Sequence, residues 1–447
     1  MSANRMKIEV NFLKEGMYIA DLDCPWHKTP FPLQGFYIRS DDDVKALAGY
    51  CKFVFVDERK SRGKHTYETR VAQKTVKEKN IVDIAQKKVE ETTAQVVKLP
   101  PLVIKSPQSY EVKSNIKKEV SRASKLHQHV YEAINSVFAT LYNGGKVSIA
   151  ETETVAQGMV ESVVRNPDAL VWLAKMNEED VYSYQHCVKS SIWALVFGRH
   201  LGLDKALLKT LAMGALLSHI GKTKLSSELR ENAETLTGDE LSAYQNYVGF
   251  GVEILEGMDN LPNGVVSVVK FHQERHNGTG FPLGVSGGRI PLLAKIAGLV
   301  DYYQSLIGPR GEAQGLSPLE AVSKLFELRN ITFQEDLVER FIEAVGVYPT
   351  GTLVELSSHE VGIVTGHNLD RRLFPKIIIV LDDHKYPLKE AKIVDLKDWN
   401  QNKTGEDGLY ISDSLPKGAY NINENEYLLT GAKSRWSWKH FAGSLAS

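Results

Sequence analysis

The spacing of apolar residues along the chain predicts a long helical region. Between about residues 110 and 345, apolar positions recur every three or four residues, which is the period of amphipathic α-helices. The first such segment covers 110–142 and ends at Asn143-Gly144-Gly145, a typical helix stop. Further segments of this kind are 151–165, 180–201, 204–218, 237–256, 262–276, 291–307 and 317–328. We therefore expect an all-α central domain.

Short strand-like runs lie on both sides of this helical region. The N-terminal runs are 8–10, 18–20 and 53–56, with a short helix expected over 41–49, and the C-terminal runs are 352–356, 361–364 and 376–381. The predicted order is therefore a small β-rich N-terminal module (1–57), a basic linker or helical region (58–109), the helical domain (110–346) and a β-rich C-terminal region (347–447).

Composition adds limits rather than a function. The 447 residues carry a formal net charge of −1, which gives no reason to expect nucleic-acid binding, although Lys and Arg outnumber Asp and Glu between 59 and 90. Three scattered cysteines do not suggest disulfides or a zinc site. We see no apolar run of about 18 residues and no secretion signal, so we expect a cytoplasmic protein without membrane insertion.

The most specific pattern is the stretch 271–291, which reads FHQERHNGTGFPLGVSGGRIP. It follows Leu-Leu-Ser-His-Ile-Gly-Lys at 216–222 and precedes Ala-Gly-Leu-Val-Asp-Tyr-Tyr at 297–303. In this order and spacing, the motifs resemble the HD-GYP family of bacterial cyclic di-GMP phosphodiesterases. Further matches lie at 166–170, 182–186 and 290–294, and the N-terminal module and C-terminal tail resemble parts that flank HD-GYP domains in one architecture of the family.

The resemblance implies a central HD-GYP helical domain with a metal-dependent hydrolase site, in which His and Asp side chains hold two or three iron or manganese ions. Paired ions neutralise the phosphate and activate water, and a bridging carboxylate fixes their spacing. In this sequence His186, His272 and Asp301 keep ligand positions. Lys222, which in the family faces the phosphate, is also kept.

Four other ligand positions of the family are changed, and they are occupied by Ser218, His219, Tyr247 and Gln273. Serine and tyrosine are poor ligands for these ions, since a phenol has a reference pKa near 10. The bridging aspartate has become an imidazole. We also expect His219 to point away from the site, because a shift of one residue on a helix rotates a side chain by about 100°.

We therefore expect a degenerate, non-hydrolytic family member with no metal cofactor, or at most one residual iron or manganese ion in a two-histidine, one-carboxylate site. It would act as a regulator or scaffold that binds cyclic di-GMP, a diguanylate cyclase or another signalling protein. Two alternatives stay open. One is an active phosphodiesterase with a rearranged metal site, and the other is a pure protein-interaction module.

The Gly-rich loop keeps its family pattern although the ligand positions have changed. The residues of this loop are Glu274, Arg275, Gly278, Thr279, Gly280, Phe281 and Pro282. Its glycines and proline either serve only to make a turn or present a surface that recognises a partner. We expect the side chains of Arg275 and Thr279 to be exposed, and Arg275 and Lys222 to suit phosphate groups.

Overall fold

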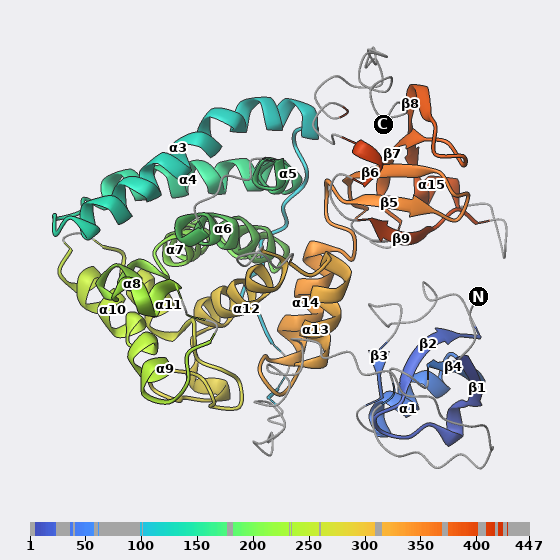
Figure 1. The fold of residues 1–447 in the computed structure, drawn as a ribbon, viewed down its shortest axis with the longest axis horizontal. Helices are drawn as coiled ribbons and strands as arrows, with labels where there is room; N and C mark the ends of the chain where they lie inside the picture. Colours follow the sequence, from blue (N-terminus) through green and yellow to red (C-terminus); the bar gives the residue numbers. More distant parts are fainter. Residues whose placement is uncertain are drawn as a thin grey trace, which may run out of the picture.

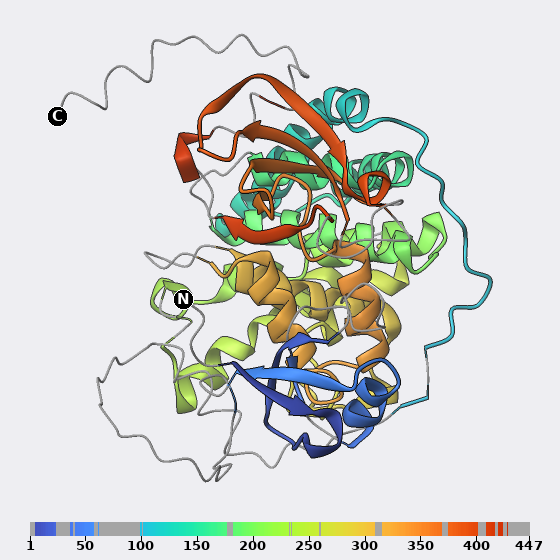
Figure 2. The same ribbon diagram turned by 90° about the vertical axis from the view of Figure 1, so that its right-hand side faces the viewer.

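The chain folds into a central helical domain with one β-sheet at each end of the sequence, as the apolar pattern predicted. The computed structural model describes residues 5–23, 36–38, 41–57, 61, 99–100, 102–176, 182–231, 233, 235–258, 261–308, 315–368, 374–400, 408–415, 419–422 and 427. Both sheets lie on the same side of the helical domain, apart from each other (Figures 1 and 2). Most of the expected basic linker lies outside the described residues. The expected domain boundaries stay predictions.

The helical domain begins with a long helix that covers one face. Its helices are α3 (Ile116–Tyr142), α4 (Ala150–Arg165), α5 (Asp168–Met176), α6 (Tyr182–His200), α7 (Lys205–Leu216), α8 (Ser227–Glu231), α9 (Gly238–Gln245), α10 (Tyr247–Glu256), α11 (Asn263–Phe271), α12 (Leu292–Ile307), α13 (Pro318–Glu327) and α14 (Glu335–Val345), with 3-10 turns η3 (Ile220–Lys224) and η4 (Gly287–Arg289). Helix α3 begins where the Asn115 side chain accepts the backbone N–H of Lys118 at 2.9 Å.

The structure differs from the predicted helices in two respects. The expected helix 237–256 is two helices, α9 and α10, which meet at Asn246. Helices α5, α8 and α14 lie within the predicted helical region but were not among the segments named from the sequence, although α14 has a clear apolar stripe that includes Leu337, Val338 and Phe341. Helices α5 and α8 are short, so each carries few repeats of the helical period.

The N-terminal sheet contains β1 (Arg5–Glu9), β2 (Tyr18–Leu22), β3 (Phe36–Tyr37) and β4 (Phe53–Asp57), in the antiparallel order β1-β4-β2-β3. The 3-10 turn η1 (Val10–Phe12) follows β1, and α1 (Asp41–Ala48) precedes β4. Alternate residues of β4, Val54 and Val56, are buried, and Ile19 and Leu47 lie in the same core. The predicted β-rich module with one short helix is thus confirmed.

The C-terminal sheet contains β5 (Leu353–Leu356), β6 (Val361–Gly366), β7 (Lys376–Leu381), β8 (Pro387–Asp395) and β9 (Ile411–Leu415). All neighbours are antiparallel, in the order β8-β7-β6-β5-β9. A short helix, α15 (Leu396–Trp399), follows β8, and the 3-10 turn η6 (Ala419–Asn421) follows β9. Residues 377–381 of β7 are all buried, so this central strand is covered on both faces.

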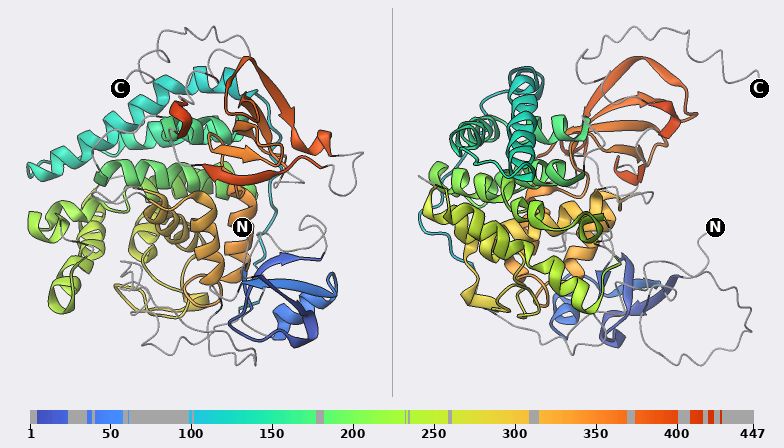
Figure 3. Two further views of the ribbon diagram at one scale, coloured as in Figure 1. Left: turned by 45° about the vertical axis from the view of Figure 1, so that its right-hand side comes forward. Right: turned by 60° about the vertical axis from the view of Figure 1, so that its left-hand side comes forward.

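Polar contacts hold each sheet against the helices. The Arg329 guanidinium lies 2.9 Å from Asp43 of α1 and 3.0 Å from Glu335 of α14, and its charge lies over the Phe326 ring. At the other sheet, the Thr350 hydroxyl donates to Asp168, the first residue of α5, at 3.0 Å. The remaining views show the N-terminal sheet next to α13 and α14 (Figure 3). No helix among the described residues is long and apolar enough to cross a bilayer.

Replacing Arg329 with alanine should loosen the N-terminal module. Arg329 is only 7% exposed and forms ion pairs with both Asp43 and Glu335. Its replacement removes this common partner of the two carboxylates. A polar group that loses a buried partner costs about 1–3 kcal/mol of unfolding free energy. Chemical denaturation and limited proteolysis of residues near 57 measure this. Lys324→Ala, which removes a partly exposed ion pair with Glu327, is the control, and equal stability of the two variants would contradict the prediction.

Candidate active site

Five segments of the helical domain meet around one buried carboxylate. Asp301 lies on α12 and His186 on α6, while His219 lies between α7 and η3. Tyr247 is the first residue of α10, and His272 and Gln273 follow α11 directly. Asp301 lies in the middle of its helix and the other side chains lie near helix ends, and all of these side chains are buried.

Both oxygens of Asp301 accept hydrogen bonds from neighbouring side chains. Oδ1 lies 2.7 Å from His186 Nε2 and 3.0 Å from His219 Nε2, and Oδ2 accepts the amide of Gln273 at 2.9 Å. The two imidazoles stack with ring centres 4.9 Å apart. Burial alone raises the pKa of Asp301, but the contacts with His219 and His186 outweigh it and lower the pKa well below its usual range. Asp301 is thus an ionised carboxylate.

His219 contributes to this cluster as a neutral imidazole. Burial lowers its pKa to about 3, and the nearby Lys222 charge acts in the same direction. The expectation that His219 points away was wrong. The helical rotation of about 100° per residue applies only inside a helix, and α7 ends at Leu216. His219 has φ −102° and ψ 11°, which turns its side chain toward Asp301.

Ser218, unlike His219, bonds the protein backbone rather than Asp301. Its hydroxyl donates to the backbone carbonyl of Ala215 at 2.9 Å and also contacts the buried Cys187 thiol. The hydroxyl is therefore used by the turn that ends α7. Ser218, which we expected to be a poor metal ligand, thus uses its hydroxyl in a backbone hydrogen bond.

The two ring nitrogens of His272 contact Tyr247 and Val269 rather than Asp301. Its Nδ1 is 2.7 Å from the carbonyl of Val269, which makes Nδ1 the protonated nitrogen and leaves Nε2 to accept the Tyr247 hydroxyl at 3.3 Å. Burial lowers the pKa of His272 to about 4 and raises that of Tyr247 well above its usual value, so both groups are neutral. The Tyr247 hydroxyl occupies the lone pair with which His272 would bind a metal.

Lys222 places a positive charge at the edge of the site. Its Nζ lies 5.0 Å from the Tyr247 ring centre and 5.4 Å from the Tyr244 ring centre. Burial alone lowers the pKa of Lys222, but its contacts with Tyr244 and Asp301 outweigh this and raise it. Gly221 beside it was not singled out from the sequence. A Cβ at Gly221 would lie 1.9 Å from the Tyr247 carbonyl, so only glycine lets η3 approach α10 this closely.

The Gly-rich loop is tied to the site through its backbone. The Glu274 carboxylate accepts the N–H groups of Leu283 and Val285 at 2.7 and 3.0 Å, which closes the loop. A Cβ at Gly280 would lie 2.4 Å from the backbone of Gln273 and Arg275, so this glycine is required by close approach. The Phe281 ring reaches the Tyr247 ring at 6.1 Å.

Arg275 is not the exposed side chain that we expected. Its guanidinium donates to the carbonyls of His272 and Glu274 at 3.1 Å and to the Gln273 side chain at 2.7 Å. The guanidinium also lies 5.5 Å from the Phe333 ring centre, so the arginine packs within the domain. Thr279 is exposed as expected, and the exposed outer edge of the loop continues through Pro282 and Leu283.

The donor set suits one metal ion and not two. Among the described residues, the His, Cys, Asp and Glu groups that could share an ion are His186, His219 and Asp301, with ligand atoms within 4.8 Å of one another. These make a two-histidine, one-carboxylate set, a known iron geometry. A second ion would have to use His272, whose lone pair accepts Tyr247, and no second carboxylate joins this group.

The chain matches two described sequence families. Residues 5–152 match a "Domain of unknown function (DUF3391)", and residues 168–333 match an "HD domain". The second match contains all the site residues described above.

The chain is also similar to curated proteins. A cyclic di-GMP phosphodiesterase of Pseudomonas aeruginosa is 26% identical over 436 residues, which is 97% of each chain. A cyclic di-GMP phosphodiesterase response regulator of Xanthomonas campestris is 27% identical over 143 residues, 32% of this chain and 38% of its own. A solved HDG"Y"P protein from Bdellovibrio bacteriovorus is 16% identical, with a TM-score of 0.43, over 76% of this chain and 98% of its own. The HD domain match, the match of the N-terminal module and a relative similar along nearly the whole chain support the resemblance to the HD-GYP family.

Proposed function

We propose that this protein acts in cyclic di-GMP signalling as a non-hydrolytic regulator or scaffold that binds the nucleotide or a protein partner. The observation that carries this proposal is the state of Asp301. His186, His219 and Asp301 form a group that we call the His–Asp cluster. Its carboxylate already accepts hydrogen bonds on both oxygens, from the two histidines and Gln273. The cluster is therefore a closed polar network that is satisfied by protein groups.

Charge also argues against a two-metal centre. Two divalent ions about 3.5–4 Å apart repel each other strongly unless anionic ligands lie between them. At the position of the family's bridging aspartate stands His219, an uncharged imidazole with a pKa of about 3. The charged Lys222 lies nearby and adds to the repulsion. One carboxylate does not offset these charges.

The same charges favour binding of a phosphate. Lys222 is half-buried, and its ammonium group lies 5.0 and 5.4 Å from the centres of two tyrosine rings. Ammonium groups suit phosphate oxygens. The relative from Pseudomonas aeruginosa, similar over 97% of this chain, is named for its action on cyclic di-GMP. Cyclic di-GMP is therefore our first choice of nucleotide, and a diguanylate cyclase or another signalling protein our first choice of protein partner.

A second candidate is a phosphodiesterase with a single metal ion. The convergence of His186, His219 and Asp301 favours it, because these residues would hold one iron or manganese ion. Such an ion would act as a Lewis acid toward a phosphate oxygen. In the absence of hydrolysis and of nucleotide binding, the chain would be a pure protein-interaction module.

Metal loading and hydrolysis separate these functions. After incubation with iron or manganese, we expect at most one ion per chain by elemental analysis, and no cleavage of cyclic di-GMP by chromatography of the products. Calorimetric titration in the same buffer should show nucleotide binding. His219→Ala should abolish any metal binding, whereas Ser218→Ala should not, because its hydroxyl bonds the backbone. Two ions per chain, or turnover of about 1 per second or more, would overturn the proposal.

Restoring the family's ligands should recover binding of two metal ions only when all four positions are changed. Ser218→His with His219→Asp alone leaves Tyr247 bonded to His272 and Gln273 bonded to Asp301. It also places a carboxylate where Asp301 now receives a hydrogen bond. Without metal, we expect this double variant to melt at least about 3 °C lower, as for a loss of roughly 1 kcal/mol.

Adding Tyr247→His and Gln273→His should give a protein that binds at least two manganese ions and melts higher with manganese than without. The double variant is the matched control. If it already binds two ions and cleaves cyclic di-GMP, the Tyr247 and Gln273 contacts do not limit the site.

Loop variants test whether the outer edge of the loop recognises a partner. Arg275→Ala should lower the melting temperature by several degrees, because it removes hydrogen bonds to three acceptors, each worth about 1 kcal/mol. Thr279→Arg changes an exposed side chain and should leave stability within about 0.5 kcal/mol. A tenfold loss of cyclase or nucleotide binding in Thr279→Arg supports recognition by the loop. Unchanged binding means that the loop is only a turn.

A further inference from the structure

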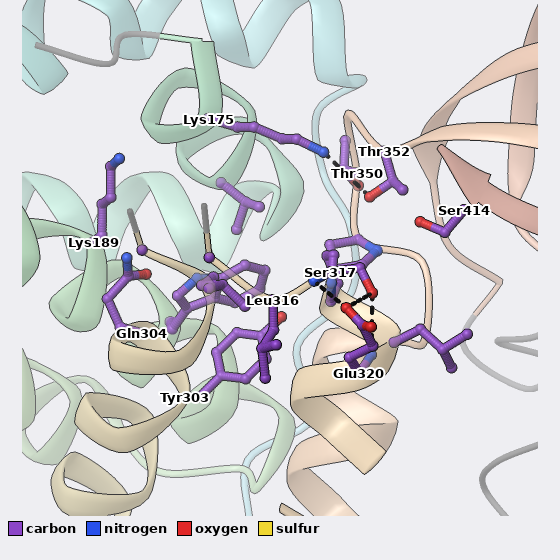
Figure 4. Close-up of a pocket in the computed structure, with 18 of the residues that line it drawn as sticks. Lys175, Lys189, Tyr303, Gln304, Leu316, Ser317, Glu320, Thr350, Thr352 and Ser414 are labelled. Atoms are coloured by element: carbon purple, nitrogen blue, oxygen red, sulfur yellow. Dashed lines mark hydrogen bonds between the residues drawn. The ribbon is translucent and has the colours of Figure 1, made fainter. Parts of the chain in front are cut away.

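A cavity of about 830 Å³ separates the helical domain from part of the C-terminal sheet (Figure 4). Helices α5, α6, α12 and α13 line one side of it, and strands β5 and β9 line the other. The volume lies in the range of small-molecule sites, which are often found where two domains meet. No residue of the His–Asp cluster lines the cavity, so the cavity is separate from that cluster.

Polar contacts tie the two sides of the cavity together. The Thr350 hydroxyl donates to Asp168 at the start of α5 at 3.0 Å. The Lys175 ammonium, further along α5, donates to the Thr352 hydroxyl at 3.3 Å (Figure 4). These bonds hold the start of β5 against α5, beside the cavity. The cavity is therefore preformed, as most small-molecule sites are.

The cavity wall contains apolar side chains that keep accessible surface. Ile307 of α12, Leu319 of α13 and Leu415 of β9 are half-buried. Leu316, which precedes α13, is 40% exposed, and Trp193 of α6 is 8% exposed. Burial of apolar surface contributes about 25 cal/mol for each Å² that is removed from water. This wall therefore favours a ligand that is itself apolar.

The backbone fixes the most exposed of these side chains in the wall. The N–H of Leu316 donates to the carbonyl of Leu306 at 2.8 Å, which holds Leu316 beside the end of α12. A Cβ at Gly315 would lie 2.2 Å from the Ile307 carbonyl oxygen, so only glycine permits this close approach. These contacts place an exposed leucine in the cavity wall.

The charged side chains of the wall give it no excess of either charge. Two are basic and two are acidic: Lys175, Lys189, Glu320 and Asp413. Glu320 accepts the backbone N–H and the hydroxyl of Ser317 at 2.9 and 2.8 Å. Asp413 accepts the N–H of Ser414 at 2.7 Å. A charged ligand would lose its hydration here without meeting an excess of opposite charge, so the wall favours an uncharged ligand.

We propose that this cavity is a second ligand site, which binds an uncharged, mainly apolar small molecule. The apolar part of the ligand would lie against Leu316, Leu319 and Leu415 and beside Trp193. One polar group of the ligand would bond the Ser414 hydroxyl at the sheet side (Figure 4). This proposal does not depend on the proposed function of the His–Asp cluster.

Two helices are shared between the cavity and that cluster. Trp193 follows His186 by seven residues on α6, and Ile307 follows Asp301 by six residues on α12. These separations correspond to rises of about 10.5 and 9 Å along the helices. The cavity is therefore far enough from the cluster to be tested separately.

Binding is tested on the full chain with N-phenyl-1-naphthylamine, an uncharged dye whose fluorescence rises in apolar surroundings. We expect saturable binding of one dye per chain. The anionic dye 8-anilinonaphthalene-1-sulfonate has the same ring system and should bind at least tenfold more weakly, because the wall has no excess of positive charge. Absence of saturable binding of the uncharged dye, or equal or tighter binding of the anionic dye, overturns the proposal.

Competition with cyclic di-GMP separates this site from the His–Asp cluster. The nucleotide should not displace the uncharged dye, because no residue of the cluster lines the cavity. Displacement would place the dye in a nucleotide site and overturn the proposal.

Variants locate the dye. Leu316→Asp places a charge in the apolar wall and should weaken binding of the uncharged dye at least tenfold. Ser414→Trp, on the edge strand β9, should fill part of the cavity with the same effect, and it serves if Leu316→Asp melts at a lower temperature. Leu207→Asp on α7 is the matched control, since Leu207 is also 40% exposed and does not line the cavity. If Leu207→Asp weakens binding as much as Leu316→Asp, or if Ser414→Trp binds normally, the cavity is not the site.

Discussion

The buried carboxylate of Asp301 joins the segments from which the candidate site is built. It lies on α12 and bonds His186 of α6, His219 after α7 and Gln273 after α11. An ionised carboxylate in such a place costs several kcal/mol unless it is hydrogen-bonded. The positions of the three partner side chains are therefore linked to one another, and Tyr247, which contacts the His219 ring at 5.6 Å, completes the group.

The sequence allowed the architecture to be predicted where its signals were local and repeated. The strands β5, β6 and β7 were visible as the apolar runs 352–356, 361–364 and 376–381 between turn residues, and α3 was visible from its stripe and its Asn-Gly-Gly end. Short elements with few repeats of the helical period, such as α5 and α8, were not named individually. The cavity between the helices and the C-terminal sheet was beyond prediction, since it depends on how Asp168 and Lys175 bond Thr350 and Thr352.

The candidate site was predicted as a set of positions but not as a geometry. The motifs were sufficient to find His186, Asp301 and Lys222. The orientation of His219 was predicted wrongly because helix geometry was extended past the end of α7. Arg275 was wrongly expected to be exposed, since no sequence pattern reveals that its guanidinium bonds groups of His272, Gln273 and Glu274. Side-chain direction after a helix end depends on backbone angles that residue spacing does not contain.

The substitutions in the site are consistent with one another. Gln273 supplies an amide where Asp301 needs a donor, and Tyr247 supplies a hydroxyl where His272 needs one. His219 donates to Asp301 where a second carboxylate would repel it. Gln273, Tyr247 and His219 thus each bond a side chain at another position of the expected ligand set, whereas Ser218 bonds the backbone of Ala215. Because the partners fit one another, a single reversion breaks a hydrogen bond before it creates a coordination site, which is why the four positions have to be considered together.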